Sequence, residues 1–129
     1  MDLKQNMVAW FEIPVQDLDR ATRFYEEVFD ITLLPQDLGP VKMSFFPYND
    51  DLPGSPGGLM YYPEEYQVSK DGVLIYFSSL AGDLNTELSR VEKAGGQILS
   101  SKRLISEEIG YMAVFIDSEG NRIALYNKA

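Results

Sequence analysis

The sequence of 129 residues contains no cysteine and no histidine. Without cysteine there can be no disulfide, no all-cysteine zinc site, no cysteine-held iron–sulfur cluster and no thiolate nucleophile. Without histidine there can be no imidazole metal ligand, no Ser-His-Asp triad and no imidazole acid–base shuttle. These two absences exclude broad classes of metalloprotein and of enzymes that use covalent catalysis.

Positive charge is scarce as well, with 11 Lys and Arg against 20 Asp and Glu, which gives a net charge of −9. Such a balance disfavours non-specific binding to nucleic acid and to anionic membranes, because both are polyanions. No stretch approaches the roughly 18 apolar residues that span a bilayer. The polar segment 1–7 also lacks the apolar core of a signal peptide. We therefore expect a cytoplasmic protein with no nucleic-acid or membrane partner.

What the chain does contain is apolar sequence, at 45% of its residues, arranged in a pattern that occurs twice. In the first half, the strand-like segment 8–15 precedes Asp17, a good helix N-cap, and apolar residues then recur at helical spacing as far as Phe29. Short strands are predicted at 31–34, 41–46 and 58–62. In the second half a strand at 73–78 precedes Asp83 and a helical stripe ending at Gly95-Gly96, and strands are predicted at 98–100, 111–116 and 122–127.

The two patterns are offset by 66 residues, the separation of Asp17 and Asp83. The sequence therefore predicts two tandem β-α-β-β-β units, at about 7–62 and 72–127, joined by a polar connector. Each unit is too small for a stable core of its own, so we expect one domain, 1–129, of the α+β class.

Three motifs, made up of five short segments, carry a resemblance to a known family. Segments 11–15 (FEIPV), 17–21 (DLDRA) and 24–29 (FYEEVF) look like the opening strand and helix of the vicinal oxygen chelate superfamily, which includes glyoxalases, bleomycin-resistance proteins and extradiol dioxygenases. Segment 117–123 (DSEGNRI) looks like its closing turn and strand, and 90–96 (RVEKAGG) is similar to the end of its second helix. The nearest resemblance is to a glyoxalase-related group of uncharacterised bacterial proteins.

The resemblance implies a curved mixed sheet around a cleft and, in metal-using members, a divalent ion held by four His, Glu or Gln side chains from the first and last strand of each unit. The positions of this chain that match are Trp10, Tyr76, Ala124 and either Gly58 or Leu59. An indole, a phenol and aliphatic or absent side chains are not ligands for such an ion. We therefore expect no metal site and no cofactor.

Strand alternation and the family register together predict which residues line the cleft: Trp10, Glu12, Leu74, Tyr76, Ser78, Arg122, Ala124 and Tyr126. Trp10 is either a core aromatic or a stacking wall for a flat or cationic ligand. Glu12 lies in an apolar strand. It is therefore paired with a cation such as Arg122, left at a solvated edge, or used as a ligand-binding carboxylate or general base.

Three functions remain open at this point. The first is metal-independent binding of a neutral or cationic small molecule in an aromatic-lined cleft. The second is a lyase or isomerase acting on a small carbonyl compound, with Glu12 as base and Tyr76 or Arg122 stabilising an oxyanion. The third is a dimeric interaction module with a vestigial cleft. The resemblance also implies a homodimer.

Overall fold

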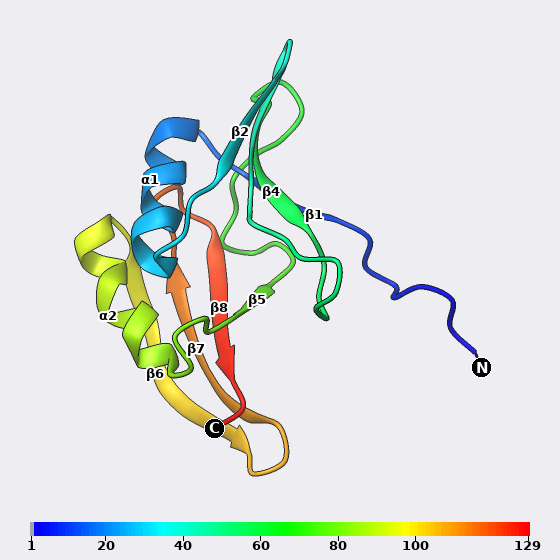
Figure 1. Ribbon diagram of the computed structural model, residues 1–129. Helices are drawn as coiled ribbons and strands as arrows, with labels where there is room; N and C mark the ends of the chain where they lie inside the picture. The colour runs from blue at the N-terminus through cyan, green and yellow to red at the C-terminus, as the bar shows by residue number, and fades with distance from the viewer. Residues whose placement is uncertain (1) are drawn as a thin grey trace.

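The computed structural model describes residues 2–129 and shows the β-α-β-β-β order twice (Figure 1). The first unit comprises β1 (Phe11–Pro14), α1 (Leu18–Phe29), β2 (Leu34–Leu38), β3 (Val41–Phe45) and β4 (Gly57–Tyr61). The second comprises β5 (Ile75–Ser78), α2 (Leu84–Ala94), β6 (Gln97–Ser106), β7 (Gly110–Ile116) and β8 (Arg122–Asn127). The α+β class is confirmed.

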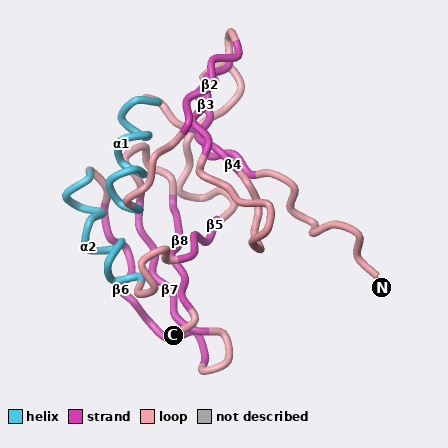
Figure 2. Tube along the Cα trace, viewed as in Figure 1, coloured by secondary structure: helices cyan, strands magenta, loops and turns pink. Residues whose placement is uncertain are grey.

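The strands form two four-stranded mixed sheets of matching topology, ordered β1-β4-β3-β2 and β5-β8-β7-β6 (Figure 2). In each sheet the first strand of the unit pairs in parallel with the last, and the other pairings are antiparallel. Strands β1 and β5 are therefore edge strands, each paired on one side only. These two edges determine where the cleft forms.

Both helices begin at the aspartates that the sequence predicts as caps. The Asp17 side chain accepts a hydrogen bond from the Arg20 N–H at 3.0 Å, and the Asp83 side chain accepts one from the Asn85 N–H at 3.0 Å. An N-terminal cap of this kind supplies an acceptor to amides that have no partner within the helix.

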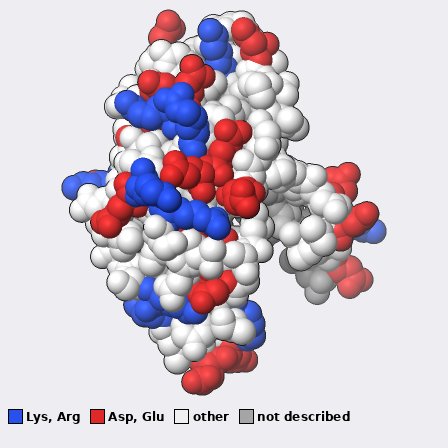
Figure 3. Space-filling model, turned by 60° about the vertical axis from the view of Figure 1, so that its left-hand side comes forward, with Lys and Arg blue, Asp and Glu red and all other residues white. Residues whose placement is uncertain are grey.

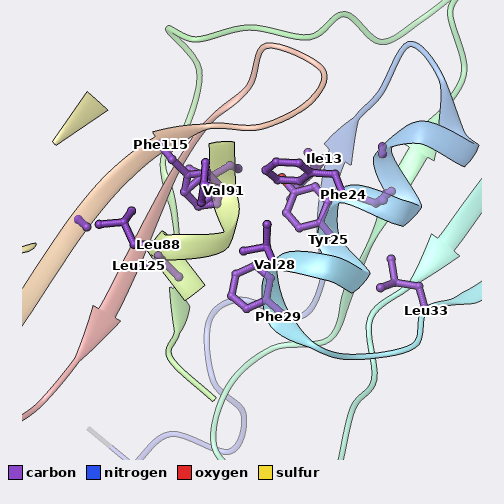
Figure 4. Packing of buried hydrophobic residues seen from close by; sticks show 14 of the residues in the cluster. Ile13, Phe24, Tyr25, Val28, Phe29, Leu33, Leu88, Val91, Phe115 and Leu125 are labelled. Atoms are coloured by element: carbon purple, nitrogen blue, oxygen red, sulfur yellow. The ribbon is translucent and has the colours of Figure 1, made fainter. Parts of the chain in front are cut away.

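The two helices pack against each other and cover one face of the sheets. Figure 4 shows this core, in which Tyr25 and Phe29 of α1 and Val91 of α2 lie together with Phe115 of β7 and Leu125 of β8. These side chains are almost completely buried. The core therefore belongs to both units, as expected if neither unit can bury its apolar face alone.

Two strands differ from their predicted positions. The segment 31–34 was expected as a strand, but β2 begins only at Leu34, because Ile31 packs against the core and the Glu26 carboxylate accepts a hydrogen bond from the Leu33 N–H at 2.9 Å. Strand β6 has 10 residues, extending well beyond the predicted 98–100. The continuation 101–106 (SKRLIS) does not alternate between polar and apolar residues as a half-buried strand does, and it is ordered by pairing with β7.

No helix within residues 2–129 is long and apolar enough to cross a membrane. On the face drawn in Figure 3, Lys and Arg side chains are interspersed with Asp and Glu, so the acidic excess does not form a single patch there.

Candidate functional site

A turn of the second unit clamps the start of the first helix. The Glu119 carboxylate accepts hydrogen bonds from the backbone N–H groups of Gln16 and Asp17, both at 2.9 Å, and from the Arg20 guanidinium at 2.7 and 2.8 Å. Burial tends to raise the pKa of Glu119, but these hydrogen bonds outweigh burial and lower its pKa. The carboxylate therefore stays charged and holds the two units together.

The same turn contains a second carboxylate, Asp117, whose pKa is shifted in the opposite direction. Asp117 accepts hydrogen bonds from the Tyr25 hydroxyl at 2.6 Å and from the Asn121 backbone N–H at 2.9 Å. Burial nevertheless raises the pKa of Asp117, and burial together with the negative charge of Asp117 raises that of Tyr25. The Asn121 amide group also donates to the Pro14 carbonyl at 2.7 Å, which ties the end of β1 to the second unit.

A cleft of about 840 Å³ opens between β1 and β5. Phe11, Phe29, Phe46 and Phe77 are among the residues that line it. The Phe11 and Phe77 rings meet edge to face with 5.8 Å between centroids, and the Phe46 and Phe77 rings lie 5.2 Å apart. These rings also belong to or pack against the core, so we take them as the floor of the cleft.

Two exposed aromatic residues stand on either side of this floor. Trp10, 38% exposed, precedes β1 and meets the Phe45 ring edge to face at 5.1 Å. Tyr76, 50% exposed, lies on β5. Aromatic side chains at this level of exposure are available to stack on a ligand.

Glu12 lies on β1 at the solvated side of the cleft. It is exposed, and its Oε2 accepts a hydrogen bond from the Trp10 indole Nε1 at 3.2 Å. Arg122 lines the same cleft without forming an ion pair with Glu12, since the ion pairs within residues 2–129 are Arg20–Glu119 and Lys102–Asp83. Of the alternatives for Glu12, the structure shows the solvated edge rather than the pairing with Arg122.

Most of the residues predicted to line the cleft do so: Trp10, Glu12, Leu74, Tyr76, Ser78 and Arg122. Ala124 and Tyr126 are not among the lining residues in the described chain. Ala124 is fully buried in a small cluster with Met112 and Val114, and the Tyr126 hydroxyl donates to the Ile109 carbonyl. Both residues lie further along β8 than Arg122 and Ile123, the two residues of this strand that line the cleft.

The structure also corrects the expected equivalence of Trp10 and Tyr76. Val15 lies two residues before the cap Asp17 and donates its backbone N–H to β4. In the second unit the matching hydrogen bond runs from the Ser79 N–H to β8, and Ser79 lies four residues before the cap Asp83. The loop after β5 is therefore longer by two residues. The buried Glu87 carboxylate holds this loop, accepting hydrogen bonds from the Ser79 hydroxyl at 2.7 Å and the Ala81 N–H at 3.0 Å.

Because of the longer loop, the offset between the first strands is 79 − 15 = 64 residues rather than 66. Leu74 is thus the counterpart of Trp10, and Tyr76 is the counterpart of Glu12. A shift of two residues preserves the alternation of side chains, so Tyr76 still faces the cleft as predicted.

Sequence reasoning missed the phenylalanine floor. With Trp10 and Glu12 expected to face the cleft, alternation along the strand puts Phe11, Ile13 and Val15 on the opposite face, and these residues do belong to the helix-covered face. The cleft nevertheless reaches this layer because β1 and β5 are not joined by hydrogen bonds, so the gap between them opens onto core side chains. The sequence offers one signal, a phenylalanine in each first strand, at 11 and 77.

Known proteins that are similar to this chain include glyoxalase-like and bleomycin resistance proteins. The family of bleomycin resistance protein-like N-terminal domains matches residues 8–44. A glyoxylase-like domain-containing protein of Didymella fabae is 27% identical over 92% of this chain and 91% of its own length. A glyoxalase/bleomycin resistance protein of Albidiferax ferrireducens superposes with a TM-score of 0.72 at 15% identity, over 96% of this chain and all of that one. The chain therefore has the fold of the glyoxalase/bleomycin resistance proteins and is similar in sequence to a glyoxylase-like domain protein over nearly its whole length.

Glyoxalase I of Zea mays has the same fold, with a TM-score of 0.70 at 21% identity over 93% of this chain. The chain spans less than half of the maize protein, 45% of its length.

The resemblance described above implies metal ligands on the first and last strand of each unit, so the donors at those positions decide whether an ion fits. The corrected register places Glu12 and Tyr76 on the first strands, Trp10 and Leu74 directly before them, and Gly58 and Ala124 on the last strands. Glu12 alone supplies a carboxylate. No group of three or more Asp and Glu side chains within residues 2–129 comes together to hold an ion, and the chain has no His or Cys. This donor set does not fit a divalent metal.

Proposed function

We propose that the protein binds a small organic molecule with a flat or cationic group in the cleft between β1 and β5, without a bound metal. The observation that carries the proposal is the cleft itself, about 840 Å³ with an aromatic floor and exposed aromatic walls. Its volume falls within the range of roughly 300–1,000 Å³ typical of small-molecule sites. Apolar lining with a few polar groups is also typical of such sites.

An exposed aromatic wall and the overall charge of the chain favour a cation over an anion. Glu12 has no cationic partner within 4.0 Å in the described chain, and the Trp10 ring face is suited to a cationic group. The net charge of −9 acts in the same direction. Arg122 is the one cationic side chain that lines the cleft among residues 2–129, and it supplies a donor for a polar group of the ligand.

The proposal is tested with N-methylquinolinium and neutral quinoline, two probes of nearly the same shape. Trp10 is the only tryptophan, so its fluorescence reports on the cleft directly. We expect saturable quenching, with tighter binding of the cation. Loss of one aromatic wall should cost about 0.5–2 kcal/mol, so Tyr76→Leu should weaken binding by roughly 2- to 30-fold in calorimetry.

Tyr48 provides a matched control, because it is 48% exposed and does not line the cleft. Tyr48→Leu should therefore leave the affinity unchanged. Absence of saturable binding by either probe, or equal losses in the two tyrosine variants, would contradict the proposal.

Neither alternative function gains support from the site. The enzymatic alternative relies on Glu12 as a base inside a pocket, and Glu12 is exposed. A vestigial cleft predicts no cavity of even about 300 Å³, the lower end of the usual range.

A further inference from the structure

The edge of β1 that faces the cleft carries unused main-chain groups. Phe11 and Val15 direct their N–H groups to carbonyls of Pro56 and Met60, at 3.2 and 3.0 Å, on the β4 side. Because successive residues of a strand alternate, the N–H and C=O of Glu12 point to the other side, toward the second unit. The hydrogen bond from Asn121 to the Pro14 carbonyl confirms that direction.

The edge of β5 is open in the same way. Ser79 donates its N–H to the Tyr126 carbonyl at 2.8 Å on the β8 side, so the main chain of Tyr76 points away from β8 and into the cleft. Within residues 2–129, no hydrogen bond reaches the main chain of Glu12 or Tyr76 from the cleft side.

The two open edges run in opposite directions across the cleft. Asn121, which contacts the end of β1, directly precedes β8, and the start of β8 pairs with the start of β5. At the other end, Phe11 at the start of β1 meets Phe77 near the end of β5. Glu12 and Tyr76 are therefore opposite each other, with free donors and acceptors on both sides of one cleft.

We propose that the ligand is a short, extended peptide-like molecule that inserts between β1 and β5 as a strand. Its amide groups pair with the main chains of Glu12 and Tyr76, as in recognition by strand addition, with partners on both sides rather than one. This inference rests on the proposed function and specifies the chemical class of the ligand. It also accounts for a cleft bounded by two unpaired edges, which otherwise leave backbone groups exposed.

Length and charge define this ligand further. Each edge strand has four residues, roughly 13 Å at about 3.3 Å per residue, which matches a tetrapeptide. The Asn121–Pro14 contact closes one end, so a free short peptide fits better than an internal segment of a protein. Successive side chains of the bound peptide would point in turn toward the phenylalanine floor and toward the solvated side of the cleft. On the solvated side, Glu12 favours a basic residue.

The test uses the tetrapeptide acetyl-Val-Lys-Val-Ser-amide and the same peptide N-methylated at both valines. Methylation removes amide donors and keeps every side chain. We expect the unmodified peptide to bind at least tenfold more tightly in calorimetry. In amide exchange followed by NMR, the N–H groups of Glu12 and Tyr76 should exchange quickly in the free protein and slowly with peptide. Those of Ile13 and Phe77, already paired in the sheets, should be slow throughout.

A pair of variants separates main-chain pairing from charge. Glu12→Pro removes the donor and should abolish peptide binding, whereas Glu12→Gln keeps the donor and should weaken it only a few-fold. The exchange experiment on the unmodified protein decides the question if Glu12→Pro does not fold. Equal affinity of the two peptides, or binding without protection of Glu12 and Tyr76, would overturn the inference. Failure of the peptide while N-methylquinolinium binds would overturn this inference alone, and failure of every probe would overturn the proposed function as well.

Discussion

At the scale of single residues, the turn 117–121 shows how position decides the behaviour of two carboxylates only two residues apart. Burial raises the pKa of Asp117 above its ordinary value, so its contribution to stability is present at low pH and declines as the pH rises through the shifted pKa. Hydrogen bonds lower the pKa of Glu119 against the effect of burial, and its contribution has the opposite pH dependence. The sequence marked both residues as family-like but gave no sign of their opposite roles.

Glu119→Gln should destabilise the protein at neutral pH, because it leaves Arg20 and the two backbone amides just before α1 with a weaker acceptor. We expect a loss of about 2 kcal/mol in the free energy of unfolding, typical of a charge-assisted network. The lowered pKa of Glu119 means that this stabilisation is present above its ordinary pKa of 4.5 and is lost as the pH falls through the folded-state value.

Urea unfolding at pH 7 and at pH 3 checks this expectation. The difference between the wild-type protein and Glu119→Gln should be large at pH 7 and small at pH 3. Glu27, exposed on α1, provides the control, and Glu27→Gln should change the free energy of unfolding little at either pH. A deficit of the same size at both pH values would show that the charge of Glu119 does not matter.

At the scale of elements, the sequence predicted those helix ends that are determined by residues close by in the chain. The caps Asp17 and Asp83 act through atoms two or three residues away, so local pattern was sufficient. It did not predict the displacement of β2, the length of β6 or the longer loop after β5, because these depend on contacts with distant residues.

The two glycines that end α2 illustrate the difference. Gly95 has φ 112°, the left-handed conformation that the sequence predicts for a helix end. Gly96 is required for another reason. A Cβ there would lie 2.5 Å from the Ile116 carbonyl oxygen, 2.8 Å from the Phe24 ring and 2.9 Å from the Val91 side chain. The close approach of α2 to β7 therefore depends on the absence of a side chain.

Gly96→Ala should destabilise the protein by about 1–3 kcal/mol, the usual cost of inserting atoms into a packed region, because the backbone carbonyl cannot move aside cheaply. Thermal or urea unfolding measures the loss. Gly72→Ala is the matched control, since its Cβ would have no neighbour nearer than 4.0 Å and its φ is not in the left-handed region. A change of less than about 0.5 kcal/mol for Gly96→Ala would show that the close contact relaxes freely.

At the scale of the whole molecule, the site arises where the two units meet. Alternation along each strand predicted the face to which Trp10, Glu12 and Tyr76 belong. It could not predict that β1 and β5 stay apart, because strand pairing depends on contacts between distant segments. For the same reason it placed Ala124 and Tyr126 in a cleft that reaches only the first two residues of β8, Arg122 and Ile123.

The same arrangement predicts how the protein responds to metal removal. Among the described cleft-facing positions of the first and last strands, Glu12 alone offers a carboxylate, whereas a stable divalent site requires three or four protein ligands. EDTA should therefore leave the melting temperature unchanged, and elemental analysis of protein purified without chelator should find no stoichiometric transition metal. Added Zn²⁺ or Ni²⁺ should not raise the melting temperature, since an ion stabilises a fold only by binding it. One equivalent of bound metal, released by EDTA with a fall in melting temperature, would refute the metal-independent part of the proposal and direct attention to ligands outside the cleft.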